Sequence, residues 1–268
     1  MLRADRSLAI FPALSTIFAA IAFALLVAPG LIWSEAVDLD WIVLPFLLVG
    51  GYAATFFVVY FNVALAGAAR LSMDGRDTTV ADGLAVARQR RGLIARWALV
   101  QFAVGVIINS LDAMAGDNPL ARAVASLVAA VANVAWSVAT FFVIPLLAIE
   151  GLGPRDALAR SAKLIRERWG EGLVGTASIG LAVFLAGLLP VLMLFGAASS
   201  AMESTPALGT ALFFLAVLAL IAVGALGSAL GVIFRVALYR HSTEGQPTGG
   251  FAEQDMVAAF RAGGRGAS

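Results

Sequence analysis

Six long apolar stretches dominate this sequence and restrict the folds that it can adopt. A bilayer core about 30 Å thick is crossed by a helix of about 20 mostly apolar residues. The six stretches run at 8–33, 41–65, 93–111, 120–149, 173–197 and 208–238. The composition, 61% hydrophobic and 13% charged, is also far from that of soluble domains. We therefore expect an all-α transmembrane bundle of about six spans over residues 1–239, followed by a cytoplasmic tail at 240–268.

The basic residues gather on one side of these predicted spans. Of the 18 Lys and Arg residues in the chain, only Arg122 falls in a loop on the opposite side. The first loop carries Glu35, Asp38 and Asp40 with no basic residue. Short loops rich in Lys and Arg stay in the cytoplasm. The distribution therefore predicts a multi-pass protein with its N-terminus and C-terminus both cytoplasmic.

Two connecting segments on the basic side share one design. TTVADGLAVARQRRGLIARWALV follows the second span, and GPRDALARSAKLIRERWGEGLVG follows the fourth. Thr79 and Asp82 have the spacing of a capping box, and Pro154 suits a first helical turn. Apolar residues then recur at helical spacing in each segment. We expect two cytoplasmic amphipathic helices, and a possible third short one at 251–262 in a partly flexible tail.

Basic side chains on these two helices are the first candidate site. Amphipathic helices can lie in the headgroup plane, and each basic residue near an anionic surface contributes roughly 1 kcal/mol. General anchoring at the interface and binding of a specific lipid or protein partner both fit this pattern. The candidate contacts are Arg88, Arg90, Arg91, Arg160, Lys163 and Arg166.

Polar residues at helical spacing inside two spans are the second candidate site. Either they form hydrogen bonds between helices, or they line a path for a neutral polar solute. Near the end of the last span, Arg235 can snorkel to the headgroups or pair with Glu150 or Glu171. The stripe consists of Gln101 and Asn109 in the third span and of Asn133, Ser137 and Thr140 in the fourth.

Residues that support catalysis are scarce. The chain has no cysteine and one histidine, His241, which lies beside Arg240 just after the last span. A zinc site needs several ligands, and no nucleotide-binding motif is present in the sequence. We expect no enzyme activity, no cofactor, no metal and no nucleic-acid partner.

Several of these segments carry a family resemblance. They are DGLAVARQRRGLIARWAL, FFVIPLLAIEGLGPRDALARSAKLIRERWGEGLVG and ALYRHSTEGQPTGGF. The chain resembles a prokaryotic domain-of-unknown-function family of six-span membrane proteins. More distantly, it is similar to the membrane domain attached to some glycerophosphodiester phosphodiesterases, although the catalytic barrel of those enzymes is absent from this sequence. The resemblance implies a cytoplasmic membrane of a prokaryote and no specific activity.

Two functions remain open at this point. The leading hypothesis is a non-catalytic membrane module whose basic cytoplasmic helices contact anionic membrane lipid or a partner protein. The alternative is a transporter or facilitator of a neutral or amphipathic solute, which the intramembrane polar stripe favours.

Overall fold

The computed structural model describes residues 10–113, 119–169 and 173–244, and over these residues it is helical without a strand. This confirms the all-α prediction. The long helices are α1 (Ile10–Val37), α2 (Val43–Met73), α4 (Arg91–Ala113), α5 (Pro119–Ala139), α8 (Leu173–Ser204) and α9 (Pro206–Glu244). The shorter elements are η2 (Asp40–Ile42), α3 (Val80–Gln89), α6 (Val143–Pro145), the π-helix η3 (Leu146–Glu150) and α7 (Pro154–Trp169).

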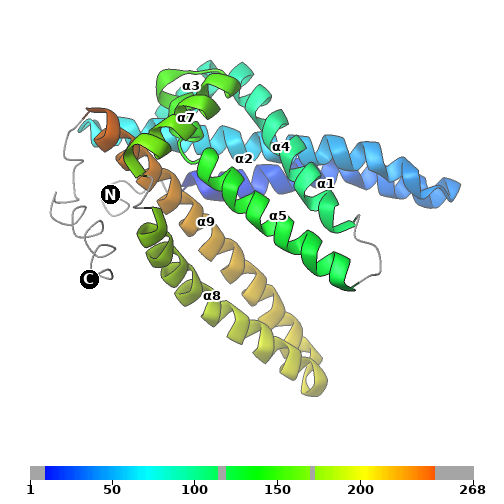
Figure 1. Cartoon of the computed structure of the whole chain (residues 1–268). Coiled ribbons are helices and arrows are strands. Elements are labelled where there is room, and N and C mark those ends of the chain that lie inside the picture. The colour runs from blue at the N-terminus through cyan, green and yellow to red at the C-terminus, as the bar shows by residue number, and fades with distance from the viewer. Residues whose placement is uncertain (1–9, 114–118, 170–172, 245–268) are drawn as a thin grey trace.

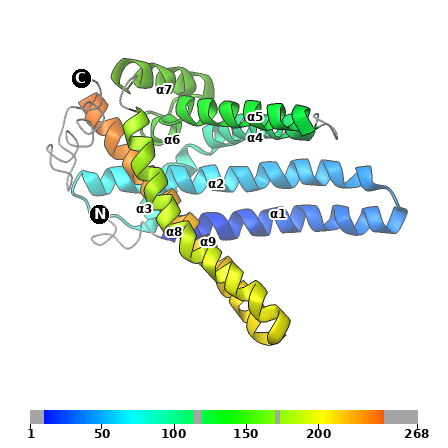
Figure 2. The ribbon, with the colours of Figure 1, turned by 60° about the horizontal axis from the view of Figure 1, so that its bottom comes forward.

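Three helical hairpins, α1–α2, α4–α5 and α8–α9, diverge from a common end of the molecule (Figures 1 and 2). Large apolar side chains are exposed along the diverging parts, as lipid-facing helices require. Five segments are long and apolar enough to cross a bilayer, which is the pattern of a multi-pass membrane protein. They are Ile10–Val37, Asp40–Met73, Arg91–Leu111, Pro119–Glu150 and Pro206–Arg240.

The sixth expected span, 173–197, falls on α8. This helix is 32 residues long, and its described side chains begin at residue 188, from which Leu188–Ser204 forms an apolar segment. The sixth span therefore stays a prediction. Two other helices exceed their expected spans on the basic side: α2 continues past residue 65 to Met73, and α9 continues past residue 238 to Glu244.

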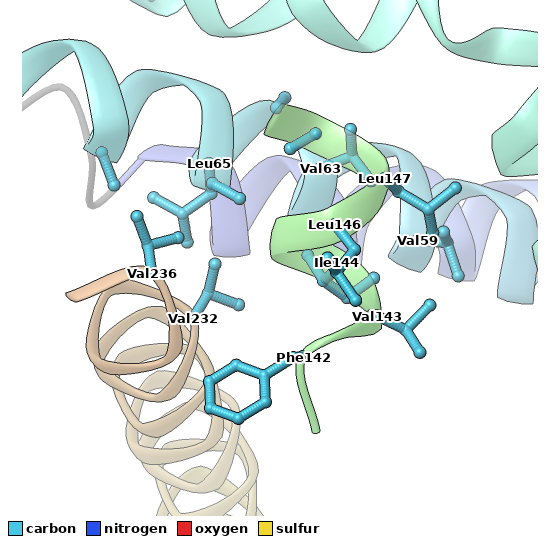
Figure 3. Packing of buried hydrophobic residues seen from close by; sticks show 14 of the residues in the cluster. Val59, Val63, Leu65, Phe142, Val143, Ile144, Leu146, Leu147, Val232 and Val236 are labelled. Carbon is cyan, nitrogen blue, oxygen red and sulfur yellow. The ribbon is translucent and has the colours of Figure 1, made fainter. Parts of the chain in front are cut away.

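The extension of α2 lies at the centre of the best-packed part of the protein. Every residue from 63 to 69 is buried, although residues 66–69 lie beyond the expected span. Around it pack α3, α6, η3 and the last turns of α9, while α7 packs on α6 and η3. We call this assembly the collar: residues 63–73 of α2, α3, α6, η3, α7 and residues 232–240 of α9. Figure 3 shows its apolar centre, where Leu65, Leu146 and Val236 come together from three elements.

Small residues allow α3 to cross α2 at very short range. A Cβ added to Gly83 would lie 2.6 Å from the carbonyl oxygen of Ala64, and one added to Gly67 would lie 2.9 Å from Val86. Glycine is needed at both positions because any larger side chain would separate the helices. The first connecting helix is therefore fixed to the end of the second span by backbone contact.

The helix of the fourth predicted span, 120–149, is interrupted. Helix α5 ends at Ala139, residues 140–142 form a turn, and the chain resumes as α6 and η3. The cause is Pro145, which has no N–H and whose ring clashes with the carbonyl four residues earlier, at Phe141. The segment ends at Gly151 in the left-handed conformation (φ 67°), where its N–H donates to the Leu146 carbonyl at 2.9 Å.

At the break, the hydroxyl oxygen of a serine in the collar accepts a hydrogen bond from a backbone N–H. The Phe142 N–H donates to Oγ of Ser161 at 3.1 Å, and Ser161 is completely buried. A buried N–H without a partner costs about 1–3 kcal/mol, so this contact stabilises the turn. It also joins α7 to the fourth span.

Candidate functional site

The expected capping box at the start of α3 is confirmed. The Thr79 N–H donates to Oδ2 of Asp82 at 2.9 Å, while the Asp82 N–H donates to Oγ1 of Thr79 at 3.3 Å. The Thr79 hydroxyl also donates to Oδ2 of Asp82 at 2.7 Å. These hydrogen bonds, first from the hydroxyl and then from the backbone N–H, lower the pKa of Asp82 below its ordinary value of 3.8. The cap fixes where α3 begins.

Helix α7 buries its apolar side against protein. Pro154 occupies its first position, as expected, and Ala157, Leu164 and Ile165 are buried in the same core cluster as α2 and α9. In α3, Gly83 and Ala87 are buried in the same way. The amphipathic pattern of both helices therefore reflects packing within the collar, whereas the sequence alone also allowed an apolar face in lipid.

The basic side chains of α7, of α3 and of the first residue of α4 remain on the outside. Arg88, Arg91, Arg160, Lys163 and Arg166 are exposed. Lys163 has a carboxylate nearby, with 3.7 Å between its Nζ and Oε1 of Glu167, but both side chains are more than half exposed. Such surface pairs contribute little and leave the charge available to other anions.

Arg90 differs from the other five basic candidates. It is half-buried, and its guanidinium lies so close to Gly151 that a Cβ at that position would collide with it. Gly151 follows the last turn of η3, so the cation lies at the carbonyl end of a helix, where positive charge is favourable. Arg90 therefore joins α3 to η3, and it is the least suited of the six to contact an outside partner.

A polar cluster that the sequence reasoning missed connects α9 to the rest of the collar. The Tyr239 hydroxyl donates to Oε1 of Glu150, at the end of η3. The adjacent Arg240 forms an ion pair with Asp74, and Asp74 also lies 3.8 Å from Nε of Arg70. A tyrosine and an arginine directly after an apolar span were visible in the sequence, but their partners lie too far away in the chain to be assigned from spacing.

Arg235 does not pair with Glu150 within the described part of the chain. Its guanidinium carbon lies 5.2 Å from the centre of the Phe141 ring, in a cation–π contact. Glu171, the other expected partner, lies outside the described residues. The half-buried Arg235 is thus held by the turn that breaks the fourth span, one helical turn before Tyr239 on α9.

Three of the five residues in the intramembrane polar stripe bond to the backbone carbonyl four residues earlier in the chain. Nδ2 of Asn109 donates to the Gly105 carbonyl at 2.8 Å, Nδ2 of Asn133 donates to the Ala129 carbonyl at 3.0 Å, and the Thr140 hydroxyl donates to the Trp136 carbonyl at 2.7 Å. Asn109, Asn133 and Ser137 are exposed, whereas Gln101 and Thr140 are half-buried. Across the described residues, no hydrogen bond joins the two halves of the stripe.

The α4–α5 hairpin is joined instead by aromatic stacking. The rings of Trp97 and Trp136 lie 5.9 Å apart and nearly parallel, at 13°. Trp97 is buried, so this pair fixes the end of the α4–α5 hairpin that adjoins the collar. The structure therefore supplies no observation that favours transport, and that alternative stays a prediction.

The side chain of His241 and the possible helix at 251–262 lie outside the described residues. A search of the described residues finds no group of three or more His, Asp or Glu side chains that is arranged to hold a metal.

Comparison with known proteins identifies one family. The model of DUF6159, a family of unknown function, matches residues 38–250. The match begins directly after α1 and includes all of the collar. No curated protein and no solved structure matches the chain, so the more distant resemblance to the membrane domain of glycerophosphodiester phosphodiesterases stays a prediction.

Proposed function

Because the chain belongs to the DUF6159 family, whose function is unknown, we propose a function from the chemistry of its own collar. The protein is a non-catalytic module of a prokaryotic cytoplasmic membrane, with both termini in the cytoplasm. Its collar contacts an anionic surface, either membrane lipid or a protein partner, through the basic side chains of α7 and of the junction between α3 and α4.

One observation carries this proposal. Both connecting helices use their apolar side for the collar core. The exposed basic residues are Arg88 on α3, Arg91 at the start of α4, and Arg160, Lys163 and Arg166 on α7. A rigid helix that presents several uncovered cations raises the local concentration of anionic ligands and orients them. The basic excess of this side of the chain supports the cytoplasmic placement of the collar.

The experiment is photocrosslinking of the full-length protein in its own membrane. A photoreactive residue replaces Ala159, which is exposed on α7 among the basic residues. Mass spectrometry then identifies the adduct as a phospholipid or a protein. We expect one main adduct, which weakens as salt is added because exposed charges are screened over about 10 Å at 0.1 M.

The decisive comparison is a variant in which three charges are neutralised together: Arg160→Gln, Lys163→Gln and Arg166→Gln. At roughly 1 kcal/mol for each charge, the affinity should fall about a hundredfold, and the adduct should disappear. The matched control removes Arg76 and Arg96, two other arginines on the same side. An adduct that persists in the triple variant, or that disappears equally in the control, would overturn the proposal.

A further inference from the structure

The half-buried arginine of the last span carries an inference beyond the collar surface. Arg235 lies 29 positions after Pro206, the first residue of α9. At 1.5 Å rise per residue, the guanidinium lies roughly 43 Å along the helix, while a bilayer with its headgroups is about 40–45 Å thick. If α9 begins at the outer surface, Arg235 therefore reaches the inner headgroup layer.

At this depth the cation has an aromatic neighbour and, within the part of the chain that the structure describes, no acidic one. Arg235 lies over the Phe141 ring, and among the described carboxylates none lies within ion-pair distance of it. Glu150, at the end of η3, already accepts a hydrogen bond from the hydroxyl of Tyr239, which lies one turn after Arg235 on α9. A guanidinium that is partly removed from water needs an anion, and it suits phosphate in particular because its planar fork donates two parallel hydrogen bonds.

We propose that Arg235 and Phe141 form a binding site for the phosphate of an anionic phospholipid of the cytoplasmic leaflet. The broken fourth span creates the site, because the turn at 140–142 places the Phe141 ring beside α9. The acyl chains lie along the side of α9 that faces away from the collar, where Leu230 and Phe234 are exposed by 49% and 40%. Gly231, one turn from Arg235 towards the bilayer centre, leaves open space beside the helix.

This site shares no residue with the basic surface formed by the α3–α4 junction and α7, so it can be tested independently. The probe is phosphatidylglycerol, added to the full-length protein in neutral detergent, with bound lipid counted by native mass spectrometry. We expect one phosphatidylglycerol to be retained in preference to phosphatidylcholine. Inorganic phosphate should not compete at millimolar concentration, because it lacks the acyl chains.

Arg235→Gln should weaken this retention by about tenfold or more, because a charge-assisted hydrogen bond is lost. Arg235→Lys should keep part of the binding, since the charge remains while the planar fork is lost. Phe141→Leu supplies a second test that keeps Arg235, and it should weaken retention by a smaller factor. The triple variant Arg160→Gln, Lys163→Gln and Arg166→Gln should retain this lipid as the wild type does.

The outcomes are distinct. Unchanged retention in both Arg235→Gln and Phe141→Leu would overturn the proposal, and so would equal retention of phosphatidylcholine. Displacement by inorganic phosphate would overturn it too, because it would show a simple anion site in place of a lipid site. Loss of the lipid only in the triple variant would overturn this site while supporting the function proposed for the collar.

Discussion

Arg240 near the end of α9 forms an ion pair with Asp74, the residue that follows α2, with 2.9 Å between Nη2 and Oδ1. The Arg240 side chain is 8% exposed and that of Asp74 is 34% exposed. The pair joins the last predicted span to the second across the collar. Because Arg240 is the less exposed of the two, its charge is less hydrated and relies more on the ion pair.

Replacing Asp74 by Asn should therefore destabilise the protein. The variant leaves Arg240 enclosed without this anion, and we expect the free energy of unfolding to fall by about 1–3 kcal/mol. Unfolding in detergent, followed by circular dichroism, measures the change. Asp77→Asn is the control, because Asp77 is an exposed acid in the same connection, and equal stability of the two variants would contradict the prediction.

Gly83 and Gly92 should respond differently to replacement by alanine. A Cβ on Gly83 would collide with the Ala64 carbonyl at 2.6 Å, so Gly83→Ala should cost about 1–3 kcal/mol as α3 is pushed from α2. A Cβ on Gly92, in the first turn of α4, meets nothing within 4 Å. Gly92→Ala should be neutral or stabilising by less than about 1 kcal/mol. Thermal unfolding of both variants checks this, and a stable Gly83→Ala would refute the close crossing.

Removal of the Ser161 hydroxyl should destabilise the turn that interrupts the fourth span. Ser161→Ala removes the hydroxyl that accepts a hydrogen bond from the buried Phe142 N–H, at a cost of about 1–3 kcal/mol. Hydrogen exchange of the Phe142 amide should become faster. Ser199→Ala is the matched control, because its hydroxyl is exposed and bonds to its own helix at Gly196. No change in Phe142 exchange would show that the serine is dispensable.

The cap of α3 should be sensitive to acid. Hydrogen bonds from Thr79 lower the pKa of Asp82 in the folded protein. The stabilisation by this carboxylate is therefore complete above the ordinary value of 3.8, and it is lost as the pH falls through the lowered pKa. NMR titration of the Asp82 carboxyl should show this lowered pKa, and Thr79→Ala should return it towards 3.8. An Asp82 pKa that Thr79→Ala leaves unchanged would contradict the assignment of the cap.

The proposed orientation can be tested by cysteine labelling, because the chain has no cysteine of its own. Glu35 lies at the end of α1 and Arg76 in the turn after α2, and both are exposed. With an impermeant reagent on intact cells, Glu35→Cys should be labelled, whereas Arg76→Cys should be labelled only after lysis. The reverse pattern would overturn the assignment of the basic side to the cytoplasm.

The helices and the α3 cap could be predicted because their causes are local in the sequence. An apolar run of sufficient length predicts a span, and Thr79 with Asp82 predicts a capping box. The break near Phe142 also had a local cause in Pro145, but membrane helices tolerate proline, so its position alone does not distinguish a bend from an interruption.

The collar could not be predicted in the same way. The period of α7 shows which side is apolar, and it does not show whether lipid or protein covers that side. The contacts of Tyr239 with Glu150 and of Arg240 with Asp74 join residues far apart in the chain, for which spacing carries no information. Asn109 and Asn133 have helical spacing, yet each amide bonds to the backbone of its own helix.

The contribution of α9 to the collar has a consequence for biosynthesis. Val232, Val236 and Tyr239 are among the α9 residues that complete a core whose members outside α9 are encoded much earlier, from Phe11 on α1 to Ile165 on α7. While the ribosome is still producing the middle of the chain, the α2 part of this core lacks the partner that later covers it. The collar therefore closes only after the final span has been synthesised, and a chain truncated before α9 would leave this apolar surface open to proteolysis.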